Sequence, residues 1–123
     1  MAKILHIEDD PDNQFIYRAI LEQEGHQVET ISDGVEAIER LKSPIDHDLI
    51  FLDIMLPKSH GVEVLRFLRR DAPLENRSKR VIILTNLENP DIKHEAEVLG
   101  IERYMIKANI DPRELLDVVS GSE

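Results

Sequence analysis

Acidic residues follow two short apolar runs in the first half of this 123-residue chain, and their types suit metal and phosphoryl chemistry. Glu8 and Asp9 follow the run 4–7, and Asp53 follows the run 49–52. If these carboxylates meet, their mutual repulsion favours a cation between them. Carboxylate oxygens are good ligands for Mg²⁺ or Mn²⁺, whereas the chain has no cysteine and no histidine cluster to suggest zinc. Because an aspartate can also accept a phosphoryl group, the sequence predicts a divalent cation beside a nucleophilic Asp53.

A hydroxyl and an ammonium group follow two further apolar runs. Thr85 comes after the run VIIL, and Lys107 comes after YMI. Thr85 could donate a hydrogen bond to a phosphoryl oxygen, and Lys107 offers a mobile positive charge. Taken singly, each residue has an ordinary interpretation: a β-branched strand residue, a surface ion pair or, for the acids, a helix N-cap. Asp10 is the best cap candidate because it directly precedes Pro11. Together, polar residues at four strand ends favour phosphoryl chemistry.

Strand-like runs alternate with helical patterns along the chain. Strands are expected at 4–7, 28–31, 49–52, 81–84 and 103–106, and helices are expected to begin near residues 11, 33, 61, 90 and 112. The first helix carries apolar residues at Phe15, Ile16, Ala19 and Ile20, and the polar segment 71–80 is expected to be a long connection. The alternation predicts one doubly wound α/β domain, (βα)5, whose parallel sheet binds ligands at the carboxyl ends of its strands.

Composition excludes several classes of function. The chain has 25 acidic and 15 basic residues, a formal net charge of −10. Binding to nucleic acid or to an anionic membrane requires clustered positive charge, so neither is expected. The lack of cysteine excludes disulfides and thiol chemistry. No apolar stretch is long enough for a membrane span or a signal peptide, and we expect a cytoplasmic protein.

Four motifs together resemble the receiver domain of two-component response regulators. They are ILHIEDDPD (4–12), DLIFLDIMLPKSHG (48–61), VIILTN (81–86) and YMIK (104–107). Their order, spacing and strand context agree with that family, and the likeness covers essentially residues 1–123. The resemblance implies a single flavodoxin-like domain with a five-stranded parallel sheet of order 2-1-3-4-5, similar to the single-domain chemotaxis regulators.

The resemblance also implies a role for each matching residue. Asp53 would accept a phosphoryl group from a sensor histidine kinase or a phosphotransfer protein, with Lys107 beside it. Mg²⁺, or Mn²⁺, would be held by Asp9, Asp53, Glu8 through water, and the backbone carbonyl of Met55. A second group of residues would carry the switch: Thr85 and Tyr104 would move. The face made by the helix near 90–100, the strand 103–106 and the helix near 112–119 would then change its affinity for an output protein. Pairing of two copies through this face is left open.

Three alternatives remain beside this single-domain switch. The chain could be the amino-terminal receiver of a longer DNA-binding transcriptional regulator. It could be a Mg²⁺-dependent phosphohydrolase, although Met55 stands where such an enzyme needs a general acid two residues after the nucleophile. It could also be a receiver that never accepts phosphate, which the intact set of motif residues argues against.

The chain departs from the family pattern after the threonine and after the lysine. Ala108 replaces a proline, so we expect a trans Lys107–Ala108 bond with a changed loop path. Asn86 stands where a small residue is usual and could narrow access to Asp53. Met55 and Leu87 occupy positions that tune hydrolysis in receivers, and since neither orients water, a long-lived phosphoryl state is expected.

Two histidines lie within these motifs. His6, inside the first strand, is expected to be a packed core residue, and His60 to lie in a loop beside the site.

Overall fold

Five short strands form one parallel sheet in the order β2-β1-β3-β4-β5. The structure is a computed structural model that describes residues 1–121. The strands are β1 (Lys3–Ile7), β2 (Gln27–Ile31), β3 (Leu49–Leu52), β4 (Arg80–Thr85) and β5 (Arg103–Ile106). Every neighbouring pair runs parallel. The predicted sheet order is therefore confirmed. The last helix ends at Ser120, and residues 122–123 lie outside the described part.

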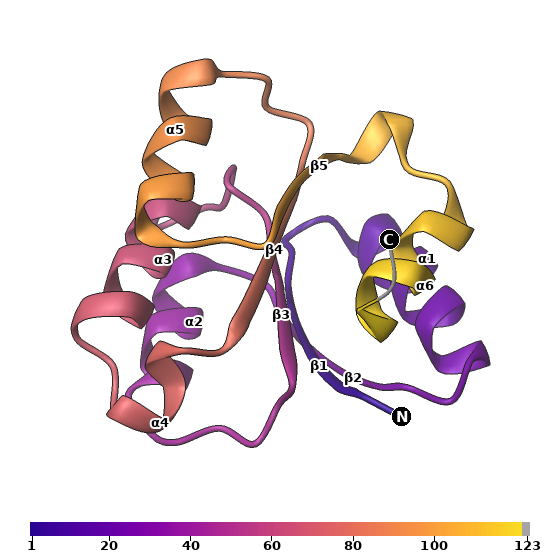
Figure 1. Cartoon of the computed structure of the whole chain (residues 1–123), viewed down its shortest axis with the longest axis horizontal. Coiled ribbons are helices and arrows are strands. Elements are labelled where there is room, and N and C mark those ends of the chain that lie inside the picture. The colour runs from indigo at the N-terminus through magenta and orange to yellow at the C-terminus, as the bar shows by residue number, and fades with distance from the viewer. Residues whose placement is uncertain (122–123) are drawn as a thin grey trace.

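Helices cover both faces of this sheet. They are α1 (Pro11–Gln23), α2 (Gly34–Leu41), α3 (Gly61–Arg70), α4 (Leu74–Arg77), α5 (Pro90–Leu99) and α6 (Pro112–Ser120), with a 3₁₀ turn at Lys107–Asn109. Helices α1 and α6 lie on one side of the sheet, and α2, α3 and α5 lie on the other (Figure 1). The expectation that 71–80 is only a connection was wrong, because the segment contains the one-turn helix α4 and the first residue of β4. None of the helices in residues 1–121 has the length and apolar character that a bilayer span requires.

Two apolar cores result from the alternation of side chains along the strands. Ile4 and Phe51 point to the α1 and α6 side, where they meet Leu115. Leu5 and Leu52 point to the opposite side, among residues of α2, α3 and α5. Successive side chains of a strand face opposite ways, so a strand covered on both faces must be apolar throughout. All four residues of β3 are buried, which explains its unbroken apolar run.

The buried face of α1 differs from the expected one. Tyr17 and Leu21 are the buried residues of this helix, whereas Phe15 is 73% exposed and Ile16 is 50% exposed. Residues 17 and 21 lie one turn apart on one face, and Phe15 lies about 200° around the helix from Tyr17. The helix therefore has two stripes of apolar residues, and the sheet contacts the stripe that contains Tyr17 and Leu21. Phe15 and Ile16 thus form an exposed apolar pair on α1.

Candidate functional site

The carboxyl ends of β1, β3 and β5 bring three carboxylates and one ammonium group together. Oxygens of Glu8, Asp9 and Asp53 all lie within 4.8 Å of one another. The Lys107 Nζ lies 2.6 Å from Glu8 Oε1 and 2.6 Å from Asp53 Oδ2. These contacts join residues 99 and 54 positions apart in the sequence. The convergence expected from the strand ends is therefore present for Glu8, Asp9, Asp53 and Lys107.

The site has a buried floor and an open edge. Glu8 is 1% exposed and Asp53 is 5% exposed, whereas Asp9 is exposed to solvent. An incoming cation or phosphoryl donor would therefore meet Asp9 before it reached the two deeper carboxylates. Three clustered carboxylate groups are also a donor set that fits a hard divalent ion.

Burial and the neighbouring charges shift the pKa values of Glu8 and Lys107 in opposite directions. Burial raises the pKa of Glu8, and the hydrogen bonds from Lys107 and the Asp10 backbone only partly offset it. For Lys107, burial lowers the pKa, but the hydrogen bonds and charges of Asp53 and Glu8 outweigh it and the pKa is raised. Lys107 thus stays charged and compensates the two buried carboxylates.

Local backbone contacts orient Asp53. The Met55 N–H donates a hydrogen bond to Asp53 Oδ1 over 3.0 Å. The first residue of α3 is Gly61, and a Cβ atom there would lie 2.2 Å from the Asp53 carbonyl oxygen. Only glycine allows this close approach of the helix to the strand end. This N–H contact leaves the Met55 carbonyl, the expected metal ligand, as a prediction.

Two residues support the strand ends in ways that the motifs did not indicate. His60 lies at the end of the loop before α3, as expected, and is the N-cap of that helix: its Nδ1 accepts from Val62 N–H, and Glu63 accepts from His60 N–H. Gln14 of α1 donates to the Glu8 carbonyl oxygen over 2.5 Å. The signal for Gln14 was its place four residues after the cap Asp10, whose side chain accepts from Asp12 N–H as expected for an N-cap.

Thr85, the last residue of β4, is linked to Tyr104 through one residue, Leu87. The Leu87 N–H donates to Thr85 Oγ1 over 3.2 Å, and the Tyr104 hydroxyl donates to the Leu87 carbonyl over 2.7 Å. Thr85 is fully buried and, while accepting this bond, keeps its own hydroxyl hydrogen for donation. Burial and the charge of Asp53 raise the pKa of Tyr104, so its phenol stays a donor. A movement of the Thr85 side chain can therefore change the position of Tyr104 through these two hydrogen bonds.

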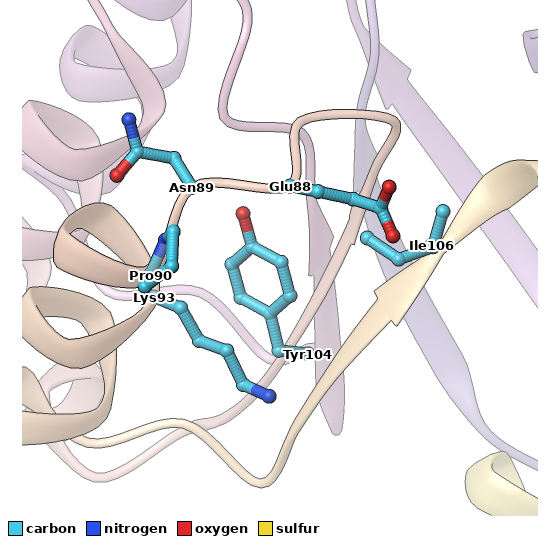
Figure 2. Close-up of a pocket in the computed structure, with 6 residues that line it drawn as sticks. All are labelled: Glu88, Asn89, Pro90, Lys93, Tyr104 and Ile106. Atoms are coloured by element: carbon cyan, nitrogen blue, oxygen red, sulfur yellow. The ribbon is translucent and has the colours of Figure 1, made fainter.

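A surface pocket of about 320 Å³ lies at this tyrosine. Figure 2 shows the Tyr104 ring at its centre, with the hydroxyl directed at the loop before α5 and the Lys93 side chain running beside the ring. The Lys93 Nζ is 5.8 Å from the ring centroid. The remaining lining residues are Glu88, Asn89, Pro90 and Ile106. Tyr104, half-buried on the edge strand β5, thus lines a surface pocket.

Asn86 and Ala108, the residues that depart from the family pattern, contact each other. Residues 1–121 contain no cis peptide bond, so the Lys107–Ala108 bond is trans, as predicted. The Ala108 N–H donates to Asn86 Oδ1 over 3.0 Å. With this trans bond, Lys107 reaches Asp53.

His6 is a packed core residue, as expected. It is 1% exposed, with ring centroids 5.5 Å from Tyr17 and 6.4 Å from Phe51 in edge-on arrangements. Burial, together with the charges of Lys107 and Arg18, lowers the pKa of His6 to about 3. The imidazole is therefore neutral at physiological pH.

Comparisons with known proteins agree with this geometry. A family model for the response regulator receiver domain matches residues 4–120. The chain is 33% identical over 124 residues to Protein PilH of Pseudomonas aeruginosa, covering 98% of this chain and 97% of that protein. It is 37% identical over 70 residues to the transcriptional regulatory protein CpxR homolog of Haemophilus influenzae, covering 57% of this chain but only 30% of that protein.

A solved structure adds a metal to the comparison. The receiver domain of the sensor histidine kinase PA1611 of Pseudomonas aeruginosa superposes with a TM-score of 0.85 at 26% identity, covering 98% of this chain and 95% of that one. That structure is described with a magnesium ion coordinated in its active site cleft. From its sheet order, its acidic cleft and these matches, the chain belongs to the receiver domains of two-component response regulators.

Proposed function

We propose that this protein is a phosphorylation-driven switch whose acceptor is Asp53. The observation that carries the proposal is the pairing of a buried Asp53 with Lys107 Nζ at 2.6 Å, beside the carboxylates of Glu8 and Asp9. An Asp53 carboxylate oxygen would attack the phosphorus of a phosphohistidine on a kinase or phosphotransfer protein. A P–O bond would form, the P–N bond would break, and the imidazole would leave with the bonding electrons.

The acidic cleft is proposed to hold Mg²⁺, or Mn²⁺. Asp9, Asp53 and the Met55 backbone carbonyl would be direct ligands, and Glu8 would bind the ion through a water molecule. Support comes from the three clustered carboxylates and from the magnesium in the PA1611 receiver domain. A bound cation would neutralise the phosphoryl oxygens during transfer. Lys107, already charged and almost buried, would pair with one of those oxygens.

The exposed apolar pair on α1 supports a protein as the phosphoryl donor. Helix α1 begins at Pro11, directly after the open edge of the site at Asp9, and presents Phe15 and Ile16 to solvent. Isolated exposed apolar residues are common on protein surfaces, but here they lie on the helix that starts at the site. We infer that a kinase or phosphotransfer protein contacts this pair while its phosphohistidine reaches Asp53.

The output is proposed to follow the Thr85–Leu87–Tyr104 hydrogen bonds. A phosphoryl group on Asp53 would attract the Thr85 hydroxyl, shift Leu87 and change the position of Tyr104 in its pocket. The surface of α5, β5 and α6 would then bind an output protein with a different affinity, as a population shift requires. We propose that residues 1–123 act in this way as one receiver in the cytoplasm.

Intact mass spectrometry tests this proposal. The protein is incubated with Mg²⁺ and acetyl phosphate, beside an Asp53→Asn variant and a sample containing EDTA. We expect a gain of one phosphoryl group in the unaltered protein with Mg²⁺ and none in the two controls. A gain that persists in Asp53→Asn would place the acceptor elsewhere. No gain from either acetyl phosphate or a purified kinase would contradict the function itself.

A second candidate is the receiver of a longer transcriptional regulator. It is favoured by the match to the CpxR homolog, of which this chain spans only 30%, whereas the full-length match to PilH favours a single-domain protein. The complete open reading frame distinguishes the two. A metabolic phosphohydrolase is disfavoured, because the family is one of signalling switches and Met55 offers no acid.

A further inference from the structure

The side chain of Asn86 bridges the loops that follow β4 and β5. Asn86 comes directly after Thr85, the last residue of β4, and its Oδ1 accepts a hydrogen bond from Ala108 N–H over 3.0 Å. Ala108 in turn comes directly after Lys107. One hydrogen bond therefore joins the residue after Thr85 to the residue after Lys107.

This hydrogen bond exists because residue 108 is not proline. Proline has no N–H, so a proline at this position would leave Asn86 without this donor. Asparagine in turn supplies the carbonyl oxygen that a small side chain at position 86 would lack. The two departures from the family pattern are thus two halves of one contact.

The turn that this contact holds is otherwise weakly fastened. Lys107, Ala108 and Asn109 form a single 3₁₀ turn, and its hydrogen bond from Ile110 N–H to the Lys107 carbonyl is 3.3 Å long, beyond the usual range. The Lys107 side chain must cross from this turn to reach Asp53 and Glu8, at 2.6 Å from each. Since lysine is long and flexible, the position of its backbone decides how often Nζ occupies that place.

We propose that Asn86 is a positioning residue for phosphoryl transfer: by holding Ala108 N–H, it places the Lys107 ammonium on Asp53. The inference rests on the proposed function of Asp53. It differs from the expectation that Asn86 narrows access to the site, since the Asn86 side chain is engaged with the Lys107 turn. Loss of the contact would slow the transfer step and leave the affinity for a small donor unchanged.

Three variants of Asn86 separate positioning from narrowing. Asn86→Ala removes both the acceptor and the bulk, Asn86→Leu removes the acceptor and keeps the bulk, and Asn86→Asp keeps an acceptor oxygen of similar reach. The rate of phosphorylation is measured against acetyl phosphate concentration in Mg²⁺ and high salt, which screens the added charge of the aspartate. We expect the alanine and leucine variants to lose about fivefold in maximal rate, the factor of one ordinary hydrogen bond. Half-saturation stays unchanged, and the aspartate variant keeps most of the rate.

A double-mutant cycle confines the effect to this contact. Ala108→Pro deletes the donor, so Asn86→Ala should have no further effect in that background. Amide hydrogen exchange of Ala108, which needs no phosphorylation, should be slow in the unaltered protein and in Asn86→Asp and about fivefold faster in the alanine and leucine variants.

The outcomes that overturn this inference differ from those that overturn the proposed function. A faster rate in Asn86→Ala together with a slower or equal rate in Asn86→Leu would show that Asn86 limits access and does not position Lys107. Equal rates in all variants would remove any role for Asn86 while leaving Asp53 as the acceptor. Failure of the unaltered protein to be phosphorylated by acetyl phosphate or kinase would remove the proposed function, and the inference with it.

Discussion

Replacing Lys107 with methionine should unbalance the charge of the site. The methionine side chain has nearly the length of lysine and no charge. Lys107 Nζ lies 2.6 Å from both Glu8 and Asp53, which are 1% and 5% exposed. Without it, these buried carboxylates and Asp9 repel one another with no cation among them. Removing one partner of a buried ion pair commonly costs about 3–5 kcal/mol.

The structure sets an upper limit on this cost and gives it a pH dependence. Burial already raises the pKa of Glu8, so the variant can relieve the repulsion by binding a proton there. A carboxyl group with the ordinary pKa of 4.5 takes up a proton at about 1.4 kcal/mol per pH unit above that value. The free energy of unfolding should therefore fall by at most about 4 kcal/mol at pH 7.5 and about 1 kcal/mol at pH 5.5. A raised folded-state pKa favours the folded protein at low pH, so the deficit must grow as pH rises.

Urea unfolding of the unaltered protein, Lys107→Met and Lys107→Arg at pH 7.5 and pH 5.5 measures this loss in the free energy of unfolding. Lys107→Arg keeps the positive charge and should lose much less stability than Lys107→Met in EDTA at pH 7.5. Magnesium should restore part of the loss in Lys107→Met, by about 3 kcal/mol when it is present at a hundred times its dissociation constant. A loss below about 1 kcal/mol in EDTA at pH 7.5, or an equal loss at both pH values, would refute the idea that Lys107 compensates buried charge.

Three further predictions concern residues around the site. Burial lowers the pKa of His6 from 6.5 to about 3, so the stability that its neutral form contributes is present above pH 6.5 and is lost as pH falls. The free energy of unfolding should therefore fall by about 2 kcal/mol between pH 7.5 and pH 5. His6→Leu should lack that part of the change, and identical pH profiles would contradict it. Phe15→Ser should slow phosphorylation by a kinase while leaving acetyl phosphate phosphorylation unchanged; equal slowing of both would exclude donor docking. Met55→Asn should shorten the lifetime of the phosphorylated protein, as followed by intact mass, and a longer lifetime in this variant would count against a long-lived phosphoryl state.

Much of the fold could be predicted because its signals are local. The unbroken apolar run of β3 required a strand covered on both faces, and Asp10 followed by Pro11 marked the start of α1. Alternation of such strands with helices left few topologies, and the resemblance to receiver domains supplied the order of the sheet. The meeting of Glu8, Asp9, Asp53 and Lys107 followed, because parallel strands end at one edge.

Other features escaped prediction because they depend on which surfaces meet. Helix α4 is a single turn in a polar segment, too short for periodicity to reveal. The hydrogen bond from Ala108 to Asn86 joins residues 22 positions apart, and each had been interpreted separately.

The sequence by itself determined the strands, their covering helices and the residue types gathered at their ends, since hydrophobic periodicity and caps act over a few neighbouring residues. Only the tertiary structure decided which stripe of α1 is buried, because the helix has two stripes of apolar residues. Tyr17 and Leu21 pack against the sheet, whereas Phe15 and Ile16 are exposed to solvent. It also decided that Lys107 lies between Glu8 and Asp53 and that Asn86 holds the turn beside it. Such contacts depend on distances between chain segments far apart in sequence, and these are set only when the helices pack on the sheet.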